Sequence, residues 1–327
     1  MKKNGYVLIL ALIILSLCTA IITSVLNRSV SHRNFAKIFN ERERTKLLAL
    51  SGIEIAINQI TFKKEEEEKK PNPNALLINL LPIINTWQTF NFEQEQGLEG
   101  KLQLYIACEQ GKIDIGQLYD FAKKQYKQNP TDAKKLLQFL DEQLKKITQK
   151  SFFETFDKFI KNTKKPLFEI TELAEIEGFK DLYNNLFFSP EQDQSIKLYD
   201  LFTVDNGNFG MNPWMLSNSL LNVLGRKNKP TDTAKNELVE KLKTVKLSGD
   251  LTKDWNQYLL PLHGIDWNTV NSDFKKIMNL NILPKTFSVF CIATIGSVSQ
   301  KIFAILAQDN IAQGDQLALR IKRIYWI

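Results

Sequence analysis

The first 26 residues constrain the fold of this chain more than any other stretch, because they contain a long apolar run without a charge. Lys2 and Lys3 precede this run, and residues 6–26 form a stretch of 21 residues with no acidic or basic side chain. A helix of this length crosses the ~30 Å hydrocarbon core of a bilayer. Lysines before the run favour a cytoplasmic N-terminus with the rest of the chain translocated. The sequence therefore predicts one transmembrane segment at residues 6–26.

Three other interpretations compete for this segment. A secretory signal peptide has a shorter apolar core and an Ala-x-Ala-like cleavage site, which residues 16–20 match poorly. A lipoprotein signal needs small residues before its cysteine, whereas Leu17 precedes Cys18. A signal anchor that is never cut remains open as an alternative.

The apolar segment runs into a second helical pattern without a break. Residues 27–60 contain no proline and a single glycine. Small and apolar residues recur there at the spacing of a buried helix face: Ala49, Gly52, Ile53, Ala56, Ile57 and Ile60. We therefore expect one helix from about residue 6 to about residue 61, roughly 80 Å long. Its first half suits lipid, and its second half should pack on a soluble domain.

The junction Gly5-Tyr6 before a long apolar helix resembles the class III signal of type IV pilins and type II secretion pseudopilins. The resemblance implies that a prepilin peptidase cuts after Gly5 and that Tyr6 becomes the methylated N-terminus. Most such proteins have Glu at the fifth mature position, where this chain has Leu10. The branch that characteristically lacks this Glu is minor pseudopilin K of the general secretion pathway.

The missing carboxylate at Leu10 has a physical meaning within this resemblance. A carboxylate in hydrocarbon is costly unless it finds a partner. In the family, the Glu is thought to pair with the N-terminal amine of the subunit ahead in the filament. Because a subunit at the tip has none ahead of it, the resemblance implies a position at the tip.

Four later segments are also similar to minor pseudopilin K, although the usual Trp- and Asp-rich stretch is not evident at residues 152–165. One of them contains the dipeptide Gly111-Lys112. The four segments are residues 43–56, 106–118, 166–179 and 198–224. The resemblance implies a pilin-like α+β fold, in which the long helix packs on a small antiparallel sheet and a large all-α insertion is added.

Residue patterns lead to the same organisation. Alternation over residues 102–108 predicts a strand with one buried face. Residues 115–195, 212–246 and 268–280 are expected to be helical, including Tyr119, Phe121 and Ala122, and three strands are expected from Thr286 to the C-terminus. The predicted divisions are a leader (1–5), a transmembrane segment (6–26), a pilin-like domain (27–110 and 199–327, with helical segments at about 212–280) and an inserted α-helical domain (111–198).

Few residues are candidates for catalysis, metal binding or a disulfide. The chain has 43 basic and 36 acidic residues, so its net charge of +7 does not single out nucleic acid as a partner. The two histidines, His32 and His263, have no metal-ligand or triad partners at suitable spacing. Cys108 and Cys291 form a disulfide or are ordinary buried thiols. No cofactor is required. Structural calcium occurs in some periplasmic pseudopilins, but no ligand set is evident among acids such as Asp193, Asp200 and Asp205.

The expected function is therefore that of a minor pseudopilin of the type II secretion system, which is not an enzyme. It is expected to be single-pass in the bacterial inner membrane with its bulk in the periplasm. The expected partners are other minor pseudopilins, the pseudopilus, the prepilin peptidase and the lipid bilayer. A minor pilin of a type IV pilus and a membrane-anchored periplasmic enzyme or binding protein remain the alternatives.

Overall fold

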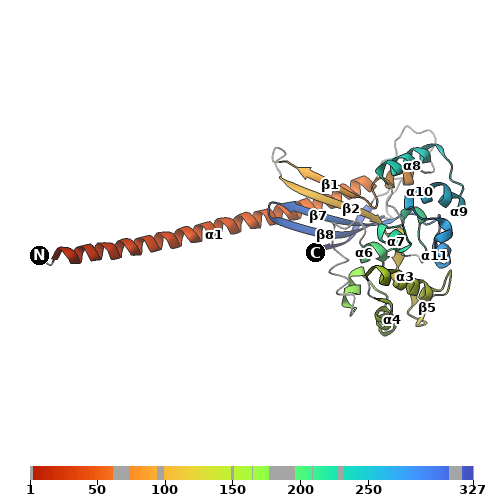
Figure 1. Cartoon of the computed structure of the whole chain (residues 1–327), viewed down its shortest axis with the longest axis horizontal. Helices are drawn as coiled ribbons and strands as arrows, with labels where there is room; N and C mark the ends of the chain where they lie inside the picture. The colour runs from red at the N-terminus through yellow and green to blue at the C-terminus, as the bar shows by residue number, and fades with distance from the viewer. Residues whose placement is uncertain are drawn as a thin grey trace.

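The expected α+β architecture is present in the computed structural model, which describes residues 3–61, 74–93, 99–148, 151–163, 165–176, 196–207, 209–226, 231–308 and 319–326. A single long helix, α1 (Lys3–Ile60), projects from a domain that combines an antiparallel sheet with shorter helices (Figure 1). The predicted helix from about residue 6 to about residue 61 is confirmed.

Helix α1 has two halves with different surroundings. Every residue from Leu8 to Asn40 is exposed, so this part of the helix projects free of the domain (Figure 1). From Thr45 onward one face is buried against strands β2 (Gly100–Cys108), β7 (Thr286–Ile295) and β8 (Val298–Gln308). Gly52 allows the close approach, because a Cβ atom there would lie 2.9 Å from the Cys291 Sγ. The predicted stripe is buried at every position except Ile57, which is half-buried.

Five antiparallel strands form the main sheet in the order β1-β2-β7-β8-β9. The three C-terminal strands expected from the β-branched and aromatic content are confirmed. The five strands are β1 (Trp87–Phe92), β2 (Gly100–Cys108), β7 (Thr286–Ile295), β8 (Val298–Gln308) and β9 (Leu319–Trp326). A tight turn joins β7 to β8 through Gly296 at φ +55°, and α1 covers one face of the sheet.

The second face of the sheet is covered at one end by the segment between β2 and β7, residues 109–285, which we call the insert. Residues Leu104 to Cys108 are all buried. The prediction of one buried face for β2 is therefore wrong over its last five residues, because the insert packs where solvent was expected. In Figure 1 the insert lies at the end of the sheet opposite to the free part of α1.

The insert is mostly helical but begins with short strands. Residues Tyr119, Phe121 and Ala122, predicted to be helical, instead form a strand and turn, with Tyr119 packed edge-to-face on Phe121 and Tyr126. The strand pairs are β3 (Ile113–Asp114) with β6 (Phe202–Thr203), parallel, and β4 (Tyr119–Asp120) with β5 (Gln125–Tyr126), antiparallel. The 3₁₀ turns are η2 (Glu109–Gly111), η3 (Ile115–Gln117), η4 (Ile170–Glu175), η5 (Pro213–Met215) and η7 (Trp267–Thr269).

The helices of the insert and its border are short and amphipathic. In α3, for example, Leu136, Leu137, Leu140 and Leu144 are buried on one face. The Thr231 hydroxyl caps α8 by accepting from the Ala234 N–H. The helices are α2 (Ala75–Leu80), α3 (Ala133–Thr148), α4 (Phe153–Asn162), α6 (Leu198–Leu201), α7 (Asn218–Val223), α8 (Asp232–Thr244), α9 (Leu251–Asp254), the π-helical turn η6 (Trp255–Leu259), α10 (Leu260–His263) and α11 (Ser272–Ile277).

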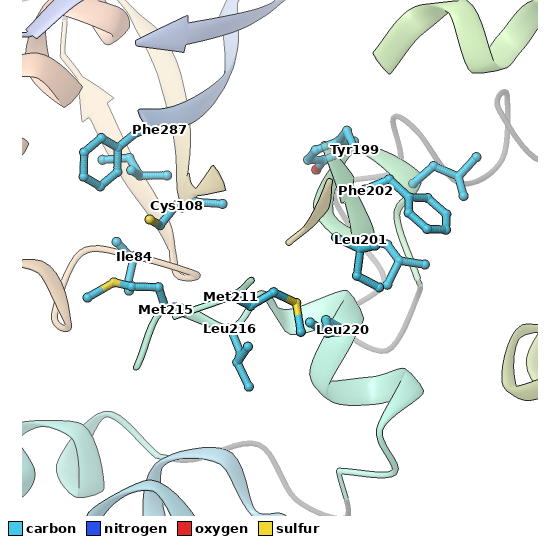
Figure 2. Packing of buried hydrophobic residues seen from close by; sticks show 14 of the residues in the cluster. Ile84, Cys108, Tyr199, Leu201, Phe202, Met211, Met215, Leu216, Leu220 and Phe287 are labelled. Carbon is cyan, nitrogen blue, oxygen red and sulfur yellow. The ribbon is translucent and has the colours of Figure 1, made fainter. Parts of the chain in front are cut away.

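The path of the chain after residue 198 differs from the expected division. The expected division places residues 199–285 in the sheet domain, yet the strand found there, β6, pairs with β3 and does not join the main sheet. Sheet and insert nevertheless share one apolar core. Figure 2 shows Cys108 and Phe287 from the sheet near Met215 of the insert, and all belong to the same buried cluster.

Candidate functional site

The free half of α1, residues 3–40, is the most unusual surface of the molecule, and we call it the arm. Large apolar side chains are exposed along its length, from Leu8 to Phe39. The arm contains no acidic residue, and the first acidic residue of the sequence, Glu41, follows directly after it. At 1.5 Å per residue the arm is about 57 Å long, nearly twice the hydrocarbon thickness of a bilayer. Among the described residues, α1 is the helix long and apolar enough to cross a membrane.

The predicted processing residues lie at the start of the arm. Gly5 and Tyr6 are within the α1 backbone, and the Tyr6 side chain lies outside what the structure describes, as do residues 1 and 2. Leu10, at the fifth position counted from Tyr6, is 48% exposed. Cleavage and methylation at Gly5 and Tyr6 stay predictions.

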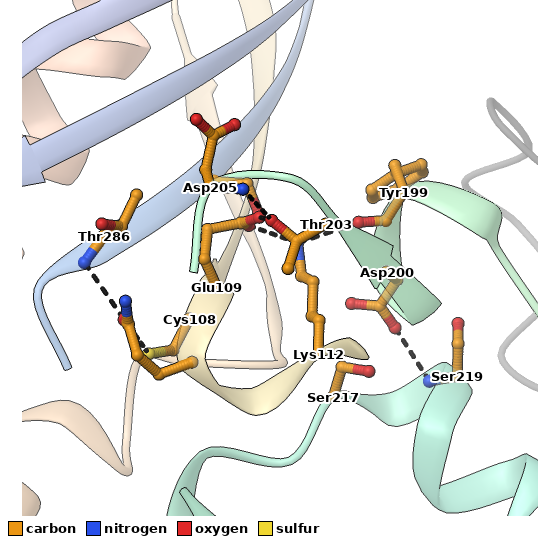
Figure 3. Close-up of polar contacts among 12 residues, drawn as sticks. Cys108, Glu109, Lys112, Tyr199, Asp200, Thr203, Asp205, Ser217, Ser219 and Thr286 are labelled. Carbon is orange, nitrogen blue, oxygen red and sulfur yellow. Dashed lines mark hydrogen bonds and ion pairs between the residues drawn. The ribbon is translucent and has the colours of Figure 1, made fainter. Parts of the chain in front are cut away.

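A second notable region is a buried ion pair where the insert leaves the sheet. The Lys112 ammonium donates to the Glu109 Oε1 at 2.5 Å, to the Tyr199 carbonyl at 2.8 Å and to the Ser288 Oγ at 2.7 Å. The other Glu109 oxygen accepts from the Thr203 hydroxyl (Figure 3). Both charged side chains are almost fully buried. Ser288 belongs to β7, whereas the other partners belong to the insert. The ion pair therefore joins the insert to the sheet.

Gly111, beside this ion pair, lets two backbone segments touch. The Asn212 N–H donates to the Gln110 carbonyl at 2.7 Å, and the Ser217 N–H donates to the Gly111 carbonyl at 3.2 Å. A Cβ atom at Gly111 would lie 1.7 Å from the Met215 carbonyl oxygen. Gly111 and Lys112 are thus neighbours with different contacts: Gly111 packs on the turn η5 within the insert, and Lys112 joins the insert to β7 through Ser288.

A row of aromatic residues crosses the whole sheet on the face that the insert covers. The strand register places one aromatic residue opposite the next on every strand from β1 to β9: Trp87, Tyr105, Phe290, Phe303 and Tyr325. Tyr199 of the insert packs on this row, with ring centroids 5.7 Å from Phe290 and 5.6 Å from Phe303. Such ring pairs stabilise packing by about 0.5–1.5 kcal/mol each beyond burial.

Polar contacts align the insert on this row. The Tyr105 hydroxyl donates to the Asp200 Oδ1 at 3.1 Å, and the Asp200 Oδ2 accepts from the Ser219 N–H at 2.8 Å. The Lys197 ammonium lies 5.3 Å from the Trp87 ring centroid. Burial, with the nearby Asp200 carboxylate, raises the pKa of Tyr105 well above its usual value, so its hydroxyl stays protonated and able to donate.

Cys108 and Cys291 do not form the disulfide that the sequence left open. The two residues lie on neighbouring strands, but Cys291 pairs with Leu104 and Cys108 pairs with Phe287. An offset of four residues along a strand is about 13 Å, whereas a disulfide needs Cα atoms within ~7 Å. Both are free, buried thiols, and burial raises the pKa of each to about 12.

Two of the three acids considered as calcium ligands, Asp200 and Asp205, have other partners. Asp200 is buried in the contacts above, and Asp205 accepts from Lys322 at 2.7 Å and from Arg323 at 3.3 Å. Asp193 lies outside the described residues. In the described part of the chain, no three His, Cys, Asp or Glu side chains group at ligating distance. Calcium binding stays untested.

A cavity of about 30 Å³ lies beside the buried Asn85, lined in part by Trp214, Asn218, Arg226 and His263. This volume suits one water molecule and not a substrate. The His263 Nε2 lies 2.8 Å from the Pro213 carbonyl oxygen, and burial lowers the pKa of His263 to about 4. Its neutral ring is therefore a packed hydrogen-bonding group at this position.

Among the described carboxyl groups of the insert, Asp114 is the one whose pKa is raised toward neutral pH. Burial raises the pKa of its carboxyl to about 7, although the N–H groups of Gly207 and Gln117 donate to it and lower the pKa. An acid with a higher pKa in the folded state stabilises the fold as pH falls through that pKa. We expect the unfolding free energy of wild type, relative to Asp114→Asn, to rise by about 2–3 kcal/mol from pH 8 to pH 5.

Urea titrations of both full-length proteins in detergent micelles at several pH values would measure this difference. His263 destabilises the fold below its unfolded pKa, but it is present in both proteins and cancels in the comparison. A difference that does not change with pH would show that Asp114 is ionised in the fold at neutral pH.

Comparisons with known proteins give a distant structural likeness. No family model matches the sequence, and no curated protein matches it. The chain is similar to a chain in the crystal structure of the GspK-GspI-GspJ complex from the enterotoxigenic Escherichia coli type 2 secretion system, with 12% identity and a TM-score of 0.43. The match covers 91% of this chain and 99% of that chain.

The resemblance inferred from sequence is thus accompanied by a resemblance in structure to a chain of a type II secretion complex. At this identity and TM-score, we draw no functional conclusion from the likeness.

Proposed function

We propose that this protein is a membrane-anchored minor pseudopilin of a type II secretion system and that its role is assembly, not catalysis. The observation that carries the proposal is the two-part helix α1. The arm is exposed and apolar, whereas one face of the second half of α1 packs on the sheet. Exposure of some 33 consecutive residues of such an apolar helix to water is unfavourable, so the arm needs lipid or other helices around it.

The start of the arm supports processing by a prepilin peptidase. Gly5-Tyr6 stands between the two lysines and the apolar run, as in class III signals. After cleavage, Tyr6 would begin the mature chain in the inner membrane, and the domain would lie in the periplasm. Leu10 leaves no carboxylate to pair with a subunit ahead.

The position of the insert supports a place at the tip of the pseudopilus. The insert lies at the end of the domain farthest from the arm (Figure 1). If arms of several minor pseudopilins bundle together, the insert would cover the surface at which a further subunit is added. The partners in this arrangement are other minor pseudopilins, and no cofactor is needed.

Mass determination of the mature chain tests the proposal directly. In cells with an active prepilin peptidase, we expect a chain that begins at a methylated Tyr6 and lacks residues 1–5. Gly5→Leu should retain the leader, because the resemblance places the cut after this glycine. Asn4→Ala, which alters the neighbouring residue, should be cut as wild type is.

Other termini would contradict the proposal in different ways. A wild-type chain that still begins at Met1 would be an uncut anchor, and one cut near residues 16–20 would have a signal peptide. A correctly cut chain that co-purifies with pilus subunits, and not with minor pseudopilins, would be a minor pilin of a type IV pilus.

A further inference from the structure

The arm carries a set of positive charges directly after its uncharged segment. Arg28, Arg33 and Lys37 are exposed, and the sequence has no acidic residue before Glu41. Lys37 approaches the Glu41 carboxylate at 3.8 Å but is 74% exposed, so this contact leaves its charge open to solvent. We infer that Arg28, Arg33 and Lys37 form a cationic collar that binds anionic phospholipid headgroups in the leaflet at which the domain leaves the membrane.

Distances along the helix place the collar at the right depth. If residues 6–26 cross the hydrocarbon core, Arg28 lies about 3 Å, Arg33 about 10 Å and Lys37 about 16 Å beyond its edge. The headgroup layer on each side is about 5–7 Å thick. Arg28 is then within this layer, and the other two lie within about a Debye length of its surface.

The angular distribution of the charges favours lipid over a protein partner. At 100° per residue, Arg28 and Lys37 lie on opposite sides of the helix, about 180° apart, with Arg33 about 140° from Arg28. A partner helix would contact one side only. A lipid leaflet surrounds the helix and can meet charges on two opposite sides, which is the distribution observed.

The inference rests on the membrane anchoring in the proposed function but not on cleavage, methylation or pseudopilus assembly. A juxtamembrane Lys or Arg contributes about 1 kcal/mol of attraction to an anionic surface, which corresponds to about a fivefold preference. One guanidinium group can donate two parallel hydrogen bonds to two oxygens of the same phosphate. The two arginines therefore suit a phosphodiester headgroup.

The experiment compares two lipids around the full-length chain. The protein is reconstituted in phosphatidylcholine vesicles that contain trace spin-labelled phosphatidylglycerol or spin-labelled phosphatidylcholine, and the fraction of each label immobilised by protein is measured. We expect phosphatidylglycerol to be preferred by about fivefold at low salt. The preference should fall at high salt, and soluble glycerol phosphate at millimolar concentration should leave it in place.

Two triple variants with the same change of charge distinguish the collar from general electrostatics. R28Q/R33Q/K37Q should abolish the preference, whereas K241Q/K243Q/K253Q, which alters exposed lysines of the insert, should retain it. Equal immobilisation of the two lipids by wild type, or a preference that survives in R28Q/R33Q/K37Q, would overturn the inference. A chain that fails to float with any vesicle would instead contradict the anchoring in the proposed function.

Discussion

Replacement of Lys112 by Met will lower the free energy of unfolding by about 3–5 kcal/mol, because it leaves the Glu109 carboxylate buried without its partner. The Tyr199 carbonyl and the Ser288 hydroxyl lose the same donor. Urea denaturation of the purified full-length chain in detergent, followed by the fluorescence of its five tryptophans, would measure the loss.

Two comparisons isolate the buried charge as the cause. The double variant Glu109→Gln/Lys112→Met removes both charges and should regain part of the lost stability. Lys243 forms a pair with Glu240 on the exposed side of α8, so Lys243→Met should change stability by no more than about 0.5 kcal/mol. If Lys112→Met were no more damaging than Lys243→Met, the pair would not hold the insert on the sheet.

Replacement of Gly111 by Ala will be about as damaging, for a steric reason. The added methyl group would lie 1.7 Å from the Met215 carbonyl oxygen and 2.4 Å from its carbon. Both atoms belong to the backbone, so rotation of a side chain cannot relieve the clash. We expect a loss of about 3 kcal/mol or more, measured by the same denaturation, with faster proteolysis of the insert than of the sheet.

Gly225→Ala is the matched control for this change. Gly225 has φ +90° but nothing within 4 Å of an added Cβ, so the variant should cost only the backbone strain of about 1 kcal/mol. Equal denaturation midpoints for Gly111→Ala and wild type would mean that the segments around Gly111 and Met215 separate easily. The start of the insert would then be only loosely packed on the turn η5.

The parts of the fold that sequence predicted are those with local, periodic signals. The long helix was evident because one apolar run continues into a stripe from Ala49 to Ile60 with no proline between them. The C-terminal strands were evident from β-branched and aromatic residues after Thr286. Helices α3 and α4 lie within residues 115–195, which the sequence predicts to be helical. In each case, neighbours in the sequence carry the information.

The contacts between sheet and insert could not be predicted from the sequence, because they join residues that are far apart in it. Gly111-Lys112 stood out as a dipeptide, yet the partners of Lys112, Tyr199 and Ser288, follow 87 and 176 residues later. The aromatic row likewise requires the register of five strands. For the same reason, the spacing of Cys108 and Cys291 could not show that they are four positions out of register.

Some local patterns were overruled by tertiary packing. Tyr119 to Ala122 have helix-like apolar content, but Tyr119 packs on Tyr126 across a short hairpin, and this pairing decides the conformation. Asp200 is an acid with no evident role in the sequence, yet it is buried because the Tyr105 hydroxyl and the Ser219 N–H satisfy its oxygens. Neither partner could be identified from the residues beside Asp200.

Because α1 is one continuous helix, its N-terminal end and the domain move together as a rigid body. The helix runs about 87 Å from Lys3 to Ile60 without a proline, and its last part is locked to the sheet that holds the insert. A tilt of about 10° at the N-terminal end would therefore move the far end by about 15 Å. If the arm lies in a bilayer as proposed, a force on the arm would displace the insert, with little lost to bending.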